Sequence, residues 1–238
     1  MNIIGIAGKA GSGKSTVAKI LVEKHGYVEI ALADDVKRIA KGIYVFTDEQ
    51  LWGPSEKRNV PDERYPRPGH AWHNANAVSC ACCGYRYEVP ADSFEASAPS
   101  FPPCYLTPRY ALQQLGTEFG RHCYEDTWVD IALYAAKYVV EEKMGYLPKY
   151  GLMPEARGVN SGVVISDVRF PNELRAIRAA GGQVWKIERS GAGLAGTAGQ
   201  HASETSLDGM PDEAFNRIIV NDGSLDDIAA AVRGGDWR

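Results

Sequence analysis

The chain has 238 residues, of which 45% are hydrophobic and 24% are charged, and its formal net charge is −4. It is long and apolar enough to bury one substantial core. The acidic balance argues against a general nucleic-acid-binding protein, which needs a basic surface to release counterions. We therefore expect no stable nucleic-acid partner, although a small anionic ligand in a local basic pocket remains compatible. No stretch is long enough to span a bilayer, and the first strand leaves no room for a signal peptide, so we expect a cytoplasmic protein with no membrane partner.

An apolar run at residues 2–7 is typical of a buried strand, and the glycine-rich stretch GKAGSGKS at residues 8–15 follows it directly. This stretch fits the phosphate-binding P-loop pattern at every specified position. Its glycines allow successive N–H groups to face a phosphate, and the helix that begins near Lys14 adds its positive dipole end. A glycine turn without a ligand is disfavoured because strand, loop and helix occur in the required order. We expect a nucleoside triphosphate to be bound by Gly11, Ser12, Gly13, Lys14, Ser15 and Thr16, with Lys14 on the β- and γ-phosphates and Ser15 on Mg²⁺.

Further apolar runs alternate with helical patterns, as in a parallel sheet covered on both faces. Strands are expected at 27–32, 162–166, 183–188 and 217–220. Helices are expected at about 14–24, 35–44, 108–123, 127–143 and 172–180, and after Ser224, a predicted N-cap. The helix at 127–143 is apolar nearly all round, so we expect it to be buried, and Cys123 is expected to be a buried packing residue.

Two segments break this alternation. Residues 54–105 are rich in proline and poor in regular periods, so they are interpreted as an insertion within a single domain that spans 1–238. Residues 190–200 are rich in glycine and alanine and directly follow a predicted strand, where ligands bind in open α/β sheets. A lid over residues 189–206 is one interpretation, and a plain flexible loop is the other.

The insertion contains a C-x-x-C-G turn, Cys80 to Gly84, that resembles the knuckle of a zinc ribbon. Cys80, Cys83 and Cys104 supply three thiolates for a structural Zn²⁺. A second complete C-x-x-C is missing, so the fourth ligand would be His73, His70 or Cys82. Reduced structural thiols without a metal are the alternative.

Charged residues follow the strand predicted at 162–166. Asp167 could hold Mg²⁺ or its waters beside the P-loop, Arg169 could contact a phosphate, and Glu173 lies just beyond. An acidic helix start is the plainer interpretation, and it applies equally to Asp34 and Asp35. In the helix at 108–123, one face carries Arg109, Gln113, Gly116 and Thr117, which could line a pocket or form a solvated face.

Six segments together resemble the bacteriophage deoxynucleoside monophosphate kinase family: the P-loop and residues 32–37, 107–121, 165–173, 187–189 and 201–204. The P-loop is shared with many unrelated NTPases, but the run DVRFPNE at 167–173 combined with LGTE at 115–118 is far more selective. The resemblance covers nearly the whole chain outside the insertion. It implies a P-loop NTPase three-layer sandwich with a five-stranded parallel sheet, ATP as donor, Mg²⁺, a lid, and location in the host cytoplasm for a phage protein.

The resemblance also implies site residues. The catalytic residues would be Lys14, Asp167 and Arg169, with Asp167 on Mg²⁺ directly or through water. Arg189 and Asn221 would join the ATP site, Asn221 because residues 221–224 resemble the segment that borders the ATP base in related kinases. Residues around the monophosphate would be Asp34, Lys37, Arg109, Gln113, Gly116, Thr117, Arg121, Trp128 and Glu173. His201 and Glu204 have no expected role beyond lid contact.

The expected reaction is ATP-dependent phosphorylation of a deoxynucleoside 5′-monophosphate to the diphosphate. A kinase for another small acceptor, such as dephospho-coenzyme A, and a P-loop module that contacts nucleic acid through a zinc knuckle remain alternatives. The sequence leaves open the preferred base, the choice between ribose and deoxyribose, and whether the protein is a homodimer.

Overall fold

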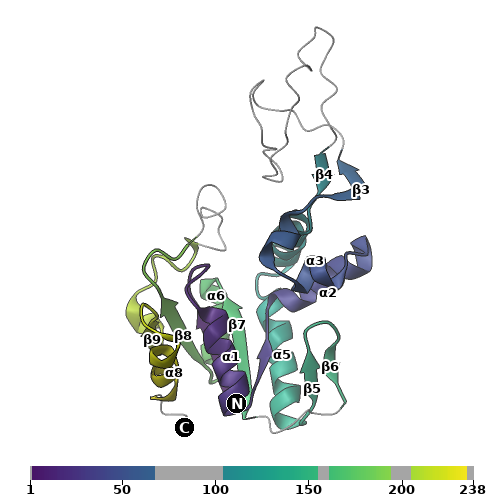
Figure 1. The fold of residues 1–238 in the computed structure, drawn as a ribbon. Helices are drawn as coiled ribbons and strands as arrows, with labels where there is room; N and C mark the ends of the chain where they lie inside the picture. The colour runs from purple at the N-terminus through teal and green to yellow at the C-terminus, as the bar shows by residue number, and fades with distance from the viewer. Residues whose placement is uncertain (1, 68–103, 155–160, 194–204, 235–238) are drawn as a thin grey trace. The chain divides into compact units, whose positions relative to one another are not determined.

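The structure is a computed structural model that describes residues 2–67, 104–154, 161–193 and 205–234. The chain divides into two compact units (Figure 1). The first combines Met1–Asp35 with Gly120–Arg238, and the second is the continuous segment Val36–Phe119. No helix in the described ranges is both long enough and apolar enough to cross a bilayer.

A five-stranded, all-parallel sheet forms the centre of the first unit, in the order β2-β7-β1-β8-β9. The strands are β1 (Ile3–Ala7), β2 (Tyr27–Ile30), β7 (Gly162–Val168), β8 (Gln183–Glu188) and β9 (Arg217–Val220). All five lie where the apolar runs predicted them. Every residue of β1 is buried, as expected for the middle strand of a sheet covered on both faces.

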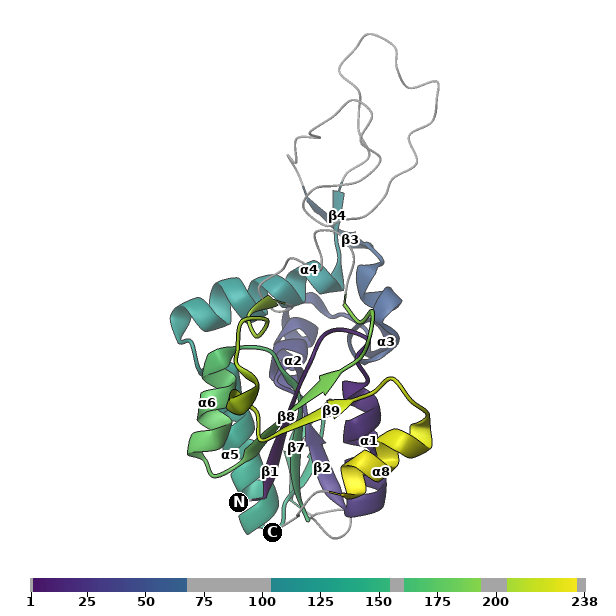
Figure 2. The ribbon, with the colours of Figure 1, turned by 90° about the vertical axis from the view of Figure 1, so that its left-hand side faces the viewer.

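Two helical layers enclose this sheet, so the predicted three-layer α/β fold is confirmed. Figure 2 shows α1 (Lys14–His25) and α8 (Leu225–Arg233) on one face, and α5 (Thr127–Glu141) and α6 (Pro171–Ala179) on the other. The first layer packs on a core that includes Ile4, Ile6, Val17, Leu21, Trp185, Ile187, Ile219 and Ile228.

The helix ends follow their local sequence signals. Gly26 ends α1 in the left-handed conformation, with φ of 70°, and its N–H donates to carbonyl oxygens in the last turn. The Ser224 hydroxyl accepts the N–H of Asp227, so the predicted N-cap of α8 is confirmed.

Two expectations about burial are wrong. Helix α5 buries one face, but Ile131 is exposed on the other and Tyr134 is 60% exposed. The helix covers only one side of the sheet, so its outer face meets solvent, and the charged residues Asp130 and Lys137 are exposed there as well. Cys123 is also exposed, because residues 122–125 lie at the end of the preceding helix, where the chain turns out to solvent.

A small antiparallel hairpin in the first unit was not predicted. It joins β5 (Gly145–Leu147) to β6 (Gly151–Met153). Tyr146 is buried there, and its hydroxyl donates to Asp34 Oδ2 at 3.2 Å.

The second unit begins within α2 (Ala33–Tyr44) and ends within a π-helix, η3 (Gln114–Arg121). Between them lie α3 (Asp48–Trp52), the 3₁₀ helix η1 (Ser55–Asn59), β3 (Asp62–Arg67), β4 (Cys104–Leu106) and α4 (Pro108–Gln113). Its core contains Ala40, Phe46, Leu51, Leu106 and Ala111. The predicted helix at 108–123 is helical throughout, but it widens from α4 into the π-helix after Gln113.

Regular structure lies inside the predicted insertion at 54–105, near both of its ends. Strands β3 and β4 pair antiparallel on either side of residues 68–103, which lie outside the described ranges. At the start of the pair, Arg64 donates to both oxygens of Asp62, and this contact is the main cause that lowers the Asp62 pKa to about 2.

Candidate functional site

The loop between β1 and α1 has the backbone that an anion-binding turn requires. Gly8, Gly11 and Gly13 have φ of 142°, 77° and 104°, values that side-chain-bearing residues rarely adopt. Space is limited as well, since a Cβ on Gly8 would collide with the carbonyl of Ile187. Gly13 caps α1, so the loop ends at the N-terminus of a 12-residue helix.

Two polar side chains of this loop are poised for a ligand in different ways. The Lys14 ammonium donates to the carbonyl oxygens of Gly8 and Lys9, at 2.6 and 2.7 Å, and therefore folds over its own loop. Ser12 is only 1% exposed, and its Oγ has no hydrogen-bond partner within the described part of the chain. Leaving a buried hydroxyl unpaired costs about 1–3 kcal/mol, which a bound oxyanion would relieve.

Asn221 braces the loop from the turn that follows β9. Its side-chain Nδ2 donates to the carbonyl of Ser12 at 2.8 Å, and its backbone N–H donates to that of Glu188 at 2.7 Å. A Cβ on Gly13 would overlap the Asn221 amide. The residue expected to border a nucleotide base therefore lies against the P-loop backbone itself.

A cavity of about 620 Å³ opens beside the P-loop at the carboxyl ends of β1, β7 and β8. Ligands bind at this edge of open parallel sheets, and the volume suits a small organic ligand. The predicted residues Ser12, Arg169 and Arg189 all line it. The remaining lining residues are Ala7, Gly8, Lys9, Val168, Lys186, Ile187, Glu188, Ser190, Ala192, Leu207, Asp208, Phe215, Val220 and Asp222.

The charged lining residues that were not predicted as site residues have polar partners around the cavity. Lys9 forms an ion pair with Asp208 at 3.2 Å, and Lys186 contacts Glu188 at 2.6 Å. Asp222 accepts both the N–H and the hydroxyl of Ser190, which lowers its pKa. Lys9, Glu188 and Asp222 carried a sequence signal, because they lie in the P-loop and in the segments 187–189 and 221–224 that the resemblance includes, whereas Lys186 and Asp208 carried none.

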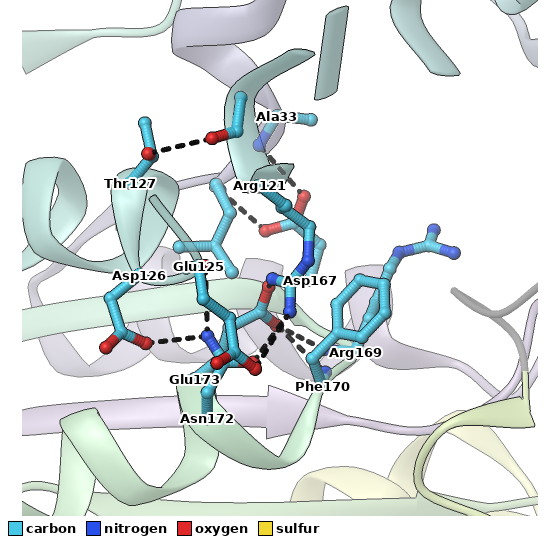
Figure 3. A network of polar contacts seen from close by, with 12 residues as sticks. Ala33, Arg121, Glu125, Asp126, Thr127, Asp167, Arg169, Phe170, Asn172 and Glu173 are labelled. Carbon is cyan, nitrogen blue, oxygen red and sulfur yellow. Dashed lines mark hydrogen bonds and ion pairs between the residues drawn. The ribbon is translucent and has the colours of Figure 1, made fainter. Parts of the chain in front are cut away.

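Asp167 and Asp34 fasten the turn between β2 and α2. The Asp167 oxygens accept the N–H groups of Leu32 and Ala33, at 2.7 and 3.2 Å (Figure 3). Asp34 is buried, and its Oδ2 accepts the N–H of Ala31 as well as the Tyr146 hydroxyl. Both carboxylates therefore have structural partners at the edge of the sheet where the P-loop lies.

A second polar network surrounds Glu173, at the start of α6 (Figure 3). Its Oε2 accepts the N–H groups of Arg169 and Phe170, at 2.7 and 3.0 Å, and its Oε1 lies 3.2 Å from Arg121 Nη1. Burial raises the Glu173 pKa to about 7, with a contribution from Asp167, while the backbone donors and Arg121 oppose that rise.

The other residues expected around a monophosphate divide between the units. Trp128, in the first unit, is buried against Gly120. A Cβ added to Gly120 would overlap the Trp128 indole. In the second unit, the Lys37 ammonium lies 5.9 Å from the Trp52 ring centroid, and Arg109 donates to Asn59 and Ser55 in η1. Half-buried positions on α4 and η3 are taken by Gln113, Gly116 and Thr117.

The predicted zinc site and most of the predicted lid fall outside the described ranges. Cys80, Cys83 and His73 are not described, and Cys104 begins β4. Among the residues that are described, no three potential ligands gather around a common point. His201 and Glu204 also lie outside, while Gly193, which precedes that gap, donates its N–H to the carbonyl of Ala10 in the P-loop at 2.9 Å.

A P-loop after the middle strand of a five-stranded parallel sheet defines a P-loop α/β protein with a sheet like that of nucleoside monophosphate kinases. No family model matches the chain. Over 232 residues, 98% of this chain and 94% of the other, it is 27% identical to a protein of Acanthamoeba polyphaga mimivirus named "Putative deoxynucleotide monophosphate kinase". The similarity supports a kinase-like chain and does not single out the phage family.

Proposed function

We propose that this protein transfers the γ-phosphoryl group of ATP to the 5′-phosphate of a deoxynucleoside monophosphate, giving the diphosphate and ADP. The observation that carries the proposal is the cavity beside the P-loop, which is lined by Arg169, Arg189 and Ser12, whose hydroxyl has no hydrogen-bond partner among the described residues. The name of the mimivirus relative, which is similar along nearly its whole length, supports the same reaction.

The residues of the site suit phosphoryl transfer, which depends on positioning and charge neutralisation. The acceptor is already an oxyanion, so no strong general base is needed. In the complex, Lys14 would exchange its two loop carbonyls for β- and γ-phosphate oxygens, and Arg169 would neutralise charge on the transferred group. Backbone N–H groups of the P-loop, which its glycines allow to face a phosphate, would donate hydrogen bonds to the same phosphates.

Oxygen donors at the head of α1 and the end of β7 fit a magnesium ion. Ser15 is exposed at the start of α1, and each Asp167 oxygen accepts one backbone N–H and keeps further lone pairs. These two residues would hold Mg²⁺, Asp167 directly or through water. When bound, the ion would neutralise charge on the donor phosphates.

On the acceptor side, we assign direct contacts to Lys37, Arg109, Gln113 and Thr117, with Gly116 leaving room for the ligand. Arg109 has hydroxyl and amide partners in η1, which a phosphate would replace with stronger charge-assisted bonds. Asp34 and Trp128 are buried in the first unit, and we assign them to its packing and not to direct contact with the acceptor. Arg189, with Asn221 bracing the loop, would complete the ATP side.

A phosphoryl-transfer assay with ATP and Mg²⁺ tests the proposal. The four common deoxynucleoside monophosphates, their ribose counterparts and dephospho-coenzyme A are offered as separate acceptors, and ADP is measured. We expect turnover with at least one deoxynucleotide, and none in Lys14→Ala. Arg175→Ala, an exposed arginine on α6, is the matched control and should keep wild-type activity.

The alternatives give distinct results in the same experiment. Turnover with dephospho-coenzyme A alone would replace the acceptor in the proposal. Absence of transfer to every acceptor, together with Kd values for single-stranded DNA or RNA in the micromolar range, would favour a nucleic-acid-binding module.

A further inference from the structure

The turn between β7 and α6 is held by one buried carboxylate. Glu173 reaches back from the first turn of α6 so that its Oε2 accepts two consecutive backbone N–H groups, those of Arg169 and Phe170. Its side chain is 5% exposed. Because both N–H groups end on one oxygen atom, the backbone of Arg169 cannot rotate without breaking a buried hydrogen bond.

Arg121 fixes that carboxylate from the opposite side. Its Nη1 donates to Glu173 Oε1 at 3.2 Å, its Nη2 donates to Asn172 Oδ1 at 2.8 Å, and its guanidinium carbon lies 3.7 Å from the Phe170 ring centroid. The Arg121 side chain is 12% exposed. A planar guanidinium can make all three contacts together, which an ammonium group could not.

Asn172 closes the network. Its Nδ2 donates to Asp126 Oδ1 at 2.7 Å and to the carbonyl of Glu125 at 3.2 Å. Figure 3 shows these groups packed around the start of α6, while the Arg169 side chain extends away from the Glu173 carboxylate. Arg169 lines the cavity together with Gly8, Lys9 and Ser12.

We propose that Arg121 and Glu173 are positioning residues, which hold the turn at Arg169–Phe170 so that the Arg169 guanidinium faces phosphate in the P-loop cavity. They contact each other and the turn, and they act on the ligand only through Arg169. This inference rests on the proposed function in one respect, namely that Arg169 binds the phosphates of the substrate.

A double-mutant cycle tests the proposal with Glu173→Gln, Arg169→Ala and their combination. Glutamine keeps one acceptor oxygen but loses the charge that pairs with Arg121. Alone, Glu173→Gln should lower kcat/KM roughly tenfold or more, whereas adding it to Arg169→Ala should change kcat/KM by less than about twofold. A residue with a merely structural role would lower kcat/KM by the same factor in both backgrounds, and that result would overturn the proposal.

A second double-mutant cycle uses Arg121→Lys in place of Glu173→Gln. It replaces the first cycle if circular dichroism and Tm show that Glu173→Gln does not fold. Lysine keeps the charge and loses the forked geometry, so the same non-additivity is expected. Arg175→Ala, which changes an exposed residue on α6, is the control. It should change kcat/KM by the same factor in the wild type and in Arg169→Ala. Equal effects of Arg121→Lys in both backgrounds would also overturn the proposal.

Binding of inorganic tripolyphosphate, measured by calorimetry, separates this inference from the proposed function. If the wild-type chain transfers phosphoryl groups to no acceptor, the kinase proposal fails. The Kd of tripolyphosphate is then measured for each variant in place of kcat/KM. A larger effect of Glu173→Gln in the wild type than in Arg169→Ala supports positioning of Arg169, and equal effects in both backgrounds refute it.

Discussion

Glu173 should make the free energy of unfolding of this protein depend on pH. Burial raises the pKa of this carboxyl from an ordinary value of 4.5 to about 7. Between these two values the folded protein keeps a proton that the unfolded chain has lost, so the free energy of unfolding falls as the pH rises. The contribution of Glu173 to the free energy of unfolding is fully present below about pH 4.5 and is lost as the pH rises through about 7. Since one pKa unit corresponds to about 1.4 kcal/mol, the whole loss amounts to about 3 kcal/mol.

Urea unfolding at several pH values from 5 to 8 measures this dependence in the wild type and in Glu173→Gln. Glutamine carries no charge at any pH, so its chain should lack this component of the slope. Other carboxyl groups titrate in both proteins and cancel in the difference. The stability of Glu173→Gln relative to the wild type should therefore increase with pH by up to about 3 kcal/mol across this range.

Parallel stability curves for the two proteins would refute the reasoning, because Glu173 would then titrate alike in the folded and unfolded chains. Glu125→Gln is the matched control. Its side chain is 66% exposed and lies 3.8 Å from the same Arg121, so its removal should leave the shape of the curve unchanged.

Three other substitutions test separate features. Lys14→Ala should abolish phosphoryl transfer while circular dichroism stays unchanged, and a wild-type kcat would remove the P-loop from the mechanism. Gly120→Ala should lower the free energy of unfolding by about 1–3 kcal/mol, because its Cβ would overlap Trp128, and an unchanged Tm would contradict that packing. We expect about one Zn²⁺ per chain purified without chelator and a loss of zinc in Cys83→Ser; a metal-free parent, or undiminished zinc in the variant, would eliminate the predicted site.

The central sheet was predictable because its middle strands β1 and β7 are largely buried and leave continuous apolar runs in the sequence. The strand expected at 162–166 extends to Val168, while the one expected at 27–32 ends at Ile30. Caps were equally local, as Gly26 and Ser224 show. In these elements, a few adjacent residues determine the structure.

Elements that depend on distant partners left weaker signals. Strand β3 contains charged residues and pairs with β4 across residues 68–103, so no alternation of polarity revealed it. The π-helix at residues 114–121 differs from an α-helix only in its wider turn, and no periodic pattern in the sequence expressed that difference. The outer face of α5 did carry a local signal, since Asp130 and Lys137 are exposed there together with Ile131 and Tyr134.

The candidate site divides along the same line. P-loop chemistry lies within eight consecutive residues, and the sequence indicated it directly. The pairing of Arg121 with Glu173 joins residues 52 positions apart, and only the fold brings them together. The family resemblance alone had predicted that both residues contact the monophosphate. In the described part of the structure, they form hydrogen bonds with each other and with the turn before α6.

The strand order β2-β7-β1 also determines when this chain can fold during its synthesis. Strands β1 and β2 come first from the ribosome, but both pair with β7, which lies between them in the sheet. At about 5–20 residues per second, the ribosome needs on the order of ten seconds to proceed from Ile30 to Gly162. During that time the apolar residues of the first two strands lack the neighbour that completes their layer, and contacts so distant in sequence also form slowly. The nascent chain should therefore be a substrate for chaperones that bind extended apolar segments until β7 has been made.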